Sequence, residues 1–194
     1  MKQQVANDTY NNDWYKKAIG ASRLKQSAWY FVNVLFFINP LNPSSGIKKL
    51  LLKWFGARVG VGVVLKPGIN IKYPWKLTIG DHSWIGEKAW IDNLAEVRIG
   101  NNVCLSQGAM LLTGNHDYTS SSFDLIIKEI VLEDGVWIGA LALVGPGVVC
   151  ASHAVLAAAS VATGPLEGYR VYRGNPASPV RERVIQPAGG EAKP

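Results

Sequence analysis

The sequence predicts an all-β fold in which short strands stack in successive coils, preceded by a helical segment and followed by a short tail. Three observations predict it. An aliphatic residue recurs every six positions, as in Ile79, Ile85 and Ile91, and the sequence pattern around Ile79 is repeated twenty residues later around Ile99. A small residue commonly follows the aliphatic one. A period of six is not the 3.6 of a helix, and repetition at this length is typical of stacked coils.

Three six-residue units make one coil with a strand on each of three sides, and the surplus of two residues in the twenty-residue units falls at a corner. Equivalent aliphatic residues then lie above one another in neighbouring coils. An antiparallel sandwich with frequent turns remains an alternative. The predicted ladders are Val59, Ile79 and Ile99, then Leu65, Ile85 and Leu105, then Ile71, Ile91 and Leu111.

The length of 194 residues favours one domain with appendages. We expect a basic, aromatic-rich helical segment over 1–56, the coils over 57–168 with a loop at about 113–130, and a C-terminal segment over 169–194 that is disordered after about 184. Two cysteines without a metal-binding pattern favour a reducing cytoplasm.

The net charge of +6 comes from the N-terminal segment, because residues 1–58 carry +7 and the remainder sums to −1. We expect residues 14–55 to cover the end of the coils, to lie on an anionic membrane surface or to pack on a neighbouring subunit. The apolar runs are too short for a membrane span, and the N-terminus lacks the apolar stretch of a signal peptide. No nucleic-acid-binding motif accompanies the basic residues, so we expect no nucleic acid partner.

The repeats, together with Thr113-Gly-Asn-His-Asp-Tyr and Gly174-Asn-Pro-Ala, resemble the hexapeptide-repeat acyltransferases, most of all the colanic-acid-type polysaccharide O-acetyltransferases. The resemblance implies a left-handed parallel β-helix and a cytoplasmic homotrimer with active sites between subunits. It also implies transfer of an acetyl group from acetyl-CoA to a sugar hydroxyl in exopolysaccharide or surface-glycan biosynthesis. The acceptor would be a sugar or a lipid-linked or nucleotide-linked glycan, and no metal is expected.

The six-residue pattern breaks between Leu112 and Val131, where a loop leaves the coil with His116 at its root. Transfer of an acetyl group to a hydroxyl needs a base, and neutral histidine suits this task near pH 7. The resemblance places the family's catalytic histidine at His116. No nucleophilic Cys or Ser motif is present, so we expect direct transfer without a covalent intermediate.

Polar residues near His116 are candidates for acceptor binding. Asp92 and Asn93 interrupt an apolar repeat one coil before it. A structural role at a corner of the coil explains these two residues equally well. Asp117 and Tyr118 directly follow the histidine.

On the donor side, the resemblance implies that acetyl-CoA lies along the C-terminal coils. Small residues would let a long, thin molecule approach the backbone, and arginine suits phosphate. Gly164 and Ser178 stand where relatives often carry basic residues, and nearby arginines would compensate. The implied donor-binding residues are Trp137, Gly139, Ala140, Ala158, Thr163, Arg173 and Arg181.

Three other functions stay open. An N-acyltransferase would use an amino sugar as acceptor. A metal enzyme of the gamma-carbonic-anhydrase type would need His82, His116 and His153 to converge on one ion, whereas we expect His82 and His153 to face solvent. A non-catalytic scaffold would need no base at His116.

Overall fold

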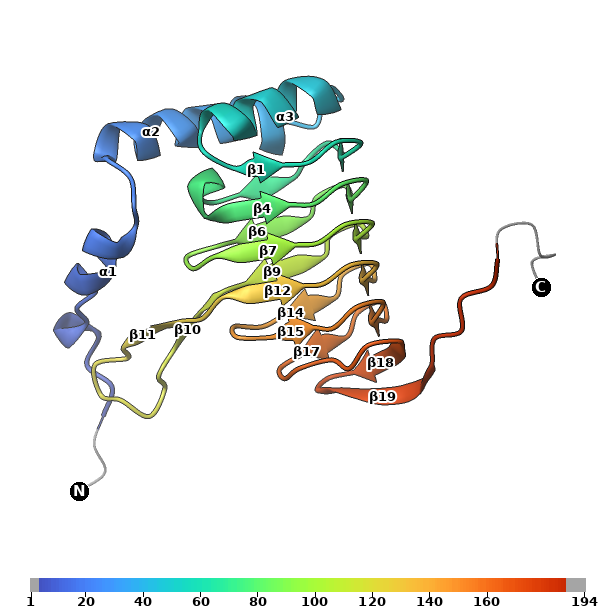
Figure 1. The fold of residues 1–194 in the computed structure, drawn as a ribbon. Helices are drawn as coiled ribbons and strands as arrows, with labels where there is room; N and C mark the ends of the chain where they lie inside the picture. Colours follow the sequence, from blue (N-terminus) through green and yellow to red (C-terminus); the bar gives the residue numbers. More distant parts are fainter. Residues whose placement is uncertain (1–3, 188–194) are drawn as a thin grey trace.

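The computed structural model describes residues 4–187 and shows a parallel β-helix with helices over its N-terminal end (Figure 1). Seen from that end, the chain turns counter-clockwise as it moves away from the viewer, so the β-helix is left-handed. The predicted fold class is confirmed. The part of the C-terminal tail at 188–194 lies outside the described residues.

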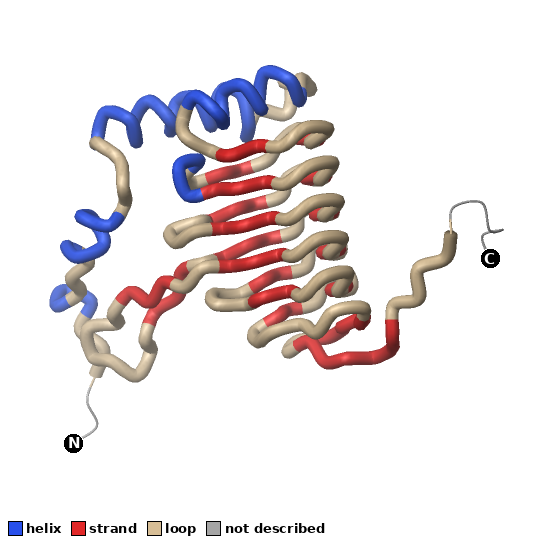
Figure 2. Tube along the Cα trace, in the orientation of Figure 1, coloured by secondary structure: helices blue, strands red, loops and turns tan. Residues whose placement is uncertain are grey.

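Three parallel sheets form the sides of the prism, shown in red in Figure 2. Sheet A contains β1 (Arg58–Val59), β4 (Leu77–Ile79), β7 (Val97–Ile99), β12 (Ile130–Leu132) and β15 (Val149–Cys150). Sheet B contains β2 (Val64–Leu65), β5 (Trp84–Ile85), β8 (Cys104–Leu105), β13 (Trp137–Ile138), β16 (Val155–Leu156), β18 (Arg170–Gly174) and the antiparallel edge strand β19 (Ala177–Glu182). Sheet C contains β3 (Asn70–Ile71), β6 (Trp90–Asp92), β9 (Met110–Leu112), β14 (Leu143–Val144) and β17 (Val161–Ala162).

The predicted aliphatic ladders form the core. Val59 pairs with Ile79 and Ile79 with Ile99, and the same register holds for the Leu65 and Ile71 ladders. Ile99 then pairs with Leu132, although 33 residues separate them. The strands thus keep their register because the intervening chain leaves the prism and returns to the same corner.

Extra residues enter the coils only where the chain passes from sheet C to sheet A, which we call the CA corner. The surplus residues of the first two coils lie there, between Ile71 and Ile79 and between Ile91 and Ile99. The long excursion leaves the coil at the same corner, after β9 and before β12. The corner insertions and the long excursion therefore lie along one edge of the prism, on the left in Figure 1.

Glycine after the aliphatic residue is required by the closeness of the next coil. A Cβ on Gly80 would lie 2.6 Å from both the carbonyl carbon and the oxygen of Gly100. Those atoms are backbone and cannot move without separating the coils. Gly164, at the last turn, has no such neighbour within 4 Å.

These two glycines make a matched pair for a stability test. We expect Gly80→Ala to lower the free energy of unfolding by about 2 to 4 kcal/mol, because it over-packs a backbone contact. Gly164→Ala should change it by less than about 1 kcal/mol. Chemical denaturation followed by circular dichroism measures both. Equal effects would show that the close approach at Gly80 does not hold the coils together.

The N-terminal helices form a cap over the first coil. It consists of α2 (Arg23–Val32), a π-helical turn (Asn33–Ile38) and α3 (Ser45–Trp54), with Ser22 and Ser44 accepting from backbone amides at the helix starts. Lys48 of α3 is fully buried, and its ammonium donates to the carbonyl oxygens of Asn42 and Lys66 at 2.7 and 3.1 Å. It thus ties the cap to the first coil. Within residues 4–187, no helix combines the length and the apolar character needed to cross a bilayer.

An N-terminal arm that includes α1 (Asp13–Ala18) runs from the excursion back to the cap along the CA corner (Figure 1). The amide of Ala6 donates to the carbonyl oxygen of Ser121, the hydroxyl of Tyr15 to that of Leu94, and the indole of Trp75 to that of Ile19. The arm is therefore bonded both to the excursion and to the coils.

Candidate active site

The excursion from the coils is a hairpin with two antiparallel strands, β10 (Gly114–His116) and β11 (Leu125–Ile127). His116 pairs with Leu125, and the amide of Asp117 donates to the carbonyl oxygen of Asp124 at 2.8 Å. At the tip, the hydroxyls of Ser120 and Ser122 donate to the carboxylate of Asp124. The segment predicted only as a loop therefore has a hydrogen-bonded framework that holds His116.

His116 is held in one orientation and one tautomer. Its half-buried ring stacks on Phe123, with centroids 4.4 Å apart and planes inclined by 6°. Its Nδ1 lies 2.8 Å from the carbonyl oxygen of Phe123. Because a carbonyl oxygen can only accept, Nδ1 carries the proton and Nε2 of the neutral ring is left with a lone pair. The free nitrogen can act as a base.

Two residues at this histidine are ones that sequence reasoning missed. Phe123 supplies both the stacking ring and the acceptor carbonyl, and it does so with a left-handed backbone at φ +51°. Tyr10 of the arm also packs near the imidazole ring of His116, with the two ring centroids 5.6 Å apart. An aromatic residue within the polar run Ser120 to Asp124 was the available signal for Phe123.

Asp117 and Tyr118 lie beside His116 in sequence and differ in their surroundings. The Asp117 carboxylate accepts from the hydroxyl and the amide of Thr119, and these bonds lower its pKa. It therefore stays ionised and closes the turn. Tyr118 is 81% exposed at the hairpin tip, free to meet a ligand or another subunit.

Asp92 and Asn93, adjacent in sequence, have separate surroundings. Asn93 is fully buried, and its amide bonds to the backbone of Tyr73 and Lys76. It holds the CA corner together, so acceptor binding by Asn93 is a wrong expectation: no polar atom of its side chain is left for a ligand. Asp92 forms an ion pair with Lys72 at 2.9 Å and remains partly exposed.

Asp92 lines a pocket of about 380 Å³ between sheet C and the cap, which we call the sub-cap pocket. Its walls combine aromatic rings with amides and the Lys72–Asp92 pair. Asp92 pairs with Leu112, four residues before His116, so the pocket and the hairpin are on neighbouring coils. The residues that characterise its chemistry are Tyr30, Asn33, Asn70, Tyr73, Trp90 and Asp92.

A larger groove of about 770 Å³ follows sheet B near its C-terminal end. It gathers five of the seven expected donor-binding residues, which are Trp137, Gly139, Ala140, Ala158 and Arg181.

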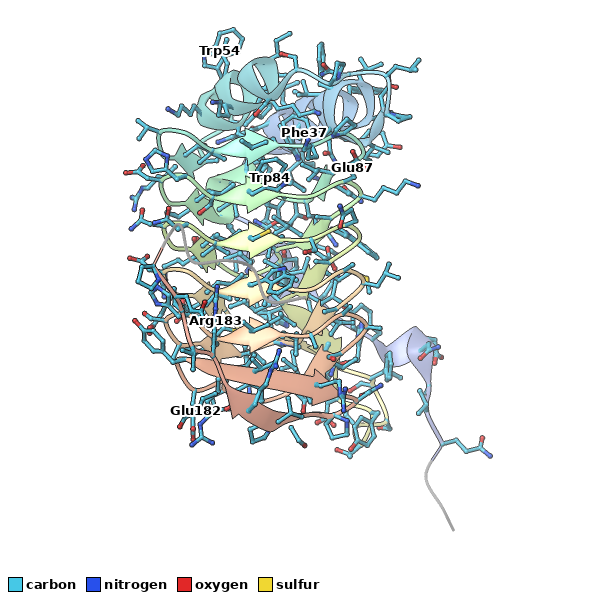
Figure 3. All side chains as sticks on the ribbon, turned by 90° about the vertical axis from the view of Figure 1, so that its right-hand side faces the viewer. Phe37, Trp54, Trp84, Glu87, Glu182 and Arg183 are labelled. Carbon is cyan, nitrogen blue, oxygen red and sulfur yellow. The ribbon has the colours of Figure 1, made fainter. Side chains whose placement is uncertain are left out.

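Part of the groove is lined by small residues, which are Gly139, Ala140, Ala157 and Ala158. A Cβ on Gly139 would lie 2.5 Å from the amide nitrogen of Ala158. One wall is the outgoing chain, held down by Arg183, whose guanidinium donates to the carbonyl oxygens of Gly135 and His153. Figure 3 looks onto this face and labels Arg183 and Glu182. A long, thin ligand fits such a channel.

Thr163 and Arg173 are not among the groove residues. Thr163 is exposed just after β17, on the sheet C side. Arg173 is exposed on β18, two residues after the groove residue Val171 and opposite Ser178 in the register of β19. Arg173 can therefore approach an extended ligand only beyond the end of the groove.

The histidine hairpin and the sheet B groove lie on opposite sides of the same chain (Figures 1 and 3). The hairpin leaves the CA corner, whereas sheet B is the side of the prism away from that corner. The prism core separates them, so one chain cannot bring His116 to a ligand lying in its own groove.

His82 and His153 occupy equivalent turns between sheets A and B, far from the hairpin in the fold. His82 is exposed, as expected. His153 is half-buried, its ring stacks on Tyr169 with centroids 4.7 Å apart, and its Nδ1 is buried without a hydrogen-bond partner. The expectation that His153 is solvated is wrong, because Tyr169 of the next turn covers it. Across residues 4–187, no three His, Cys, Asp or Glu side chains are grouped to hold a metal ion.

The fold is that of solved hexapeptide-repeat acetyltransferases. The structure of one from Vibrio cholerae superposes with a TM-score of 0.76 at 23% identity, covering 86% of this chain and 96% of that one. A galactoside acetyltransferase solved with coenzyme A superposes with a TM-score of 0.72 at 20% identity, covering 88% and 83%. No protein-family model matches the sequence.

Sequence similarity extends the likeness beyond the fold, and the chain belongs to the hexapeptide-repeat acetyltransferases. It is 36% identical over 165 residues to WcaF of Escherichia coli, whose name assigns it to the acetyltransferases of colanic acid biosynthesis. That match covers 85% of this chain and 91% of WcaF.

Proposed function

We propose that the protein transfers the acetyl group of acetyl-CoA to a hydroxyl of a sugar used in exopolysaccharide or surface-glycan assembly, with His116 as the general base. The observation that carries the proposal is the hydrogen bond from His116 Nδ1 to the Phe123 carbonyl, which leaves Nε2 free to take a proton. The similarity to WcaF and the solved complexes of related folds with acetyl-CoA and CoA support the donor.

The proposed reaction is a direct transfer. His116 Nε2 removes the proton of the acceptor hydroxyl as its oxygen attacks the thioester carbonyl. The tetrahedral intermediate collapses, the carbon–sulfur bond breaks, and the CoA sulfur takes the proton back from the imidazolium. The products are the acetyl ester and free CoA. The Phe123 carbonyl stabilises the imidazolium that forms in between, because it accepts from the protonated Nδ1.

We propose that three copies assemble and that each active site lies between two of them. The position of His116 and the groove on opposite sides of one chain supports this arrangement, since the base of one subunit must then serve the groove of its neighbour. In the groove, Gly139 and Ala140 would face the thioester, Ala158 the pantetheine arm, and Arg181 the phosphates. Arg173 would reach only the far end of the donor.

We further propose that the acceptor sugar occupies the sub-cap pocket and extends toward His116. Aromatic faces such as Trp90 and Tyr30 suit the apolar faces of a sugar ring, and the Asp92 carboxylate and the Asn70 amide suit its hydroxyls. We place the enzyme on the cytoplasmic side of the membrane, where a lipid-linked or nucleotide-linked sugar would be presented to it.

A screen for acceptor-dependent release of CoA tests the proposed function. Acetyl-CoA is incubated with free sugars, nucleotide sugars and amino sugars, thiol is measured, and the product is analysed by mass spectrometry and mild alkali. We expect a product with an alkali-labile ester. An alkali-stable amide would instead identify an N-acyltransferase, and no acceptor-dependent thiol release from any sugar class would contradict the proposal.

The acceptor pocket is tested by comparing two tryptophans on one coil. Trp90 lines the sub-cap pocket, and Trp84 on sheet B is as exposed but lines neither this pocket nor the groove. We expect Trp90→Ala to raise the KM for the acceptor roughly tenfold through loss of a stacking surface, with the KM for acetyl-CoA unchanged. Trp84→Ala should leave both values near those of the unaltered protein. An unchanged acceptor KM in Trp90→Ala would place the sugar elsewhere.

A further inference from the structure

The cap has a second apolar face that no other part of residues 4–187 covers. Its inner face carries Trp29, Phe37 and Leu52, which are buried against the first coil. Figure 3 shows Phe37 under the cap and Trp54 on the far side, pointing away from the coils. The outer cap face consists of Leu24, Phe31, Leu35, Ile47, Leu50 and Trp54, each between 47% and 80% exposed.

Helical geometry places these residues together. Phe31 and Leu35 are four residues apart, on the side of the helix opposite the buried Trp29. Leu50 and Trp54 are likewise four apart in α3, opposite Lys48. A cap that only covered the core would expose polar residues on this side. Large exposed apolar faces mark sites of interaction.

The charge in this part of the chain has one sign. No Asp or Glu occurs between residues 14 and 80, whereas that stretch contains eleven basic residues. Four of those on the cap and just after it, Arg23, Lys49, Lys53 and Arg58, have exposed or half-exposed side chains. The others are Lys16, Lys17, Lys25, Lys48, Lys66, Lys72 and Lys76.

We propose that the outer cap face docks on an anionic lipid bilayer, with the cap helices lying parallel to the surface. Phe31, Leu50 and Trp54 would enter the boundary between headgroups and acyl chains, and Lys49 and Lys53 would meet the lipid phosphates. A second copy of the same face is a poor partner, because its basic residues would confront the same charges. An anionic bilayer complements both the apolar side chains and the charge.

Docking in this orientation has a consequence for the acceptor, which rests on the proposed function. The sub-cap pocket lies directly under the cap and shares α2 with the outer face, and Tyr30 of that helix lines the pocket. The pocket would then open about one helix diameter, roughly 10 Å, from the lipid surface. A sugar attached to a membrane lipid through a phosphate could reach it without leaving the bilayer.

Co-sedimentation of the full chain with vesicles tests the proposal. One set of vesicles contains phosphatidylcholine alone and the other an equal mixture with phosphatidylglycerol. We expect binding to the anionic vesicles only, weakened by salt. Replacement of Phe31, Leu50 and Trp54 by Ser should lower binding at least about tenfold. Lys49→Glu with Lys53→Glu should lower it at least about 30-fold.

A matched control replaces three exposed valines in the C-terminal part of the chain, Val149, Val180 and Val184, by Ser and should bind vesicles like the unaltered protein. Equal binding by the cap variants and this control would overturn the proposal. So would a cap variant that loses its oligomeric state in size-exclusion chromatography, because the face would then join copies of the chain. Thiol release with a water-soluble sugar separates the two ideas: its absence contradicts the proposed function, and vesicle binding is judged independently.

Discussion

Replacement of His116 by Ala is expected to slow acceptor-dependent release of CoA by about 10³-fold, the usual contribution of a general base. The effect should fall on kcat, because the imidazole acts as the hydroxyl loses its proton and contributes little to the binding of acetyl-CoA. The half-exposed position of the ring on a hairpin outside the core means that the coils should remain folded. Steady-state thiol release, with circular dichroism and size-exclusion chromatography, measures both properties.

His82→Asn is the matched control for this experiment. His82 is an exposed histidine at a turn with φ +56°, a conformation that asparagine tolerates. It should keep full turnover. If His116→Ala also turned over at the unaltered rate, the base would be another group, and a non-catalytic role for the hairpin would be favoured.

Mixed assemblies of two inactive chains are expected to regain about one third of the normal activity per site. One chain carries His116→Ala, and the other carries Ala158→Trp, which fills the groove from an exposed floor position. In a randomly mixed trimer, a site is active when a subunit with an intact histidine precedes one with an intact groove. Every trimer that contains both chains has one such junction among its three sites, hence one third of the sites.

The two chains are co-expressed with different affinity tags and purified through both. Each single variant alone, and a mixture of separately assembled variants, should remain inactive. Mixed assemblies that remain as inactive as the single variants would mean that the base and the groove of one subunit serve the same site. That result would contradict the inter-subunit arrangement and would require the hairpin to fold back over its own sheet B.

The prism could be predicted from the sequence because its rules are local. Each coil repeats the same contact, so the six-residue period alone predicts that Ile79, Ile85 and Ile91 are buried. The structure pairs them with the expected neighbours. The spacing of twenty also indicated a surplus at a corner. It did not say which corner, because any turn can absorb two residues. The handedness came from the resemblance to the family.

The candidate site could be predicted from the sequence only in part. His116 stood out because the period fails there, and the small residues of the groove were implied by the family. Phe123 could not be assigned, because its role depends on a left-handed backbone conformation that turns its carbonyl toward the histidine. For Asn93 the sequence left acceptor binding and a corner role equally open, because only the fold shows that the amide faces the backbone of the preceding coil.

The sequence alone predicted a β protein of stacked coils with a basic helical segment and one conspicuous histidine. Three further features depended on tertiary structure: the tautomer of His116, the pocket beneath the cap, and the outward face of the cap. Each of these joins residues that are far apart in the chain or sets the direction of a side chain. Periodicity reports which residues are buried, whereas the meeting of Asp92 with Tyr30, or of the arm with the hairpin, is decided by packing between separate elements.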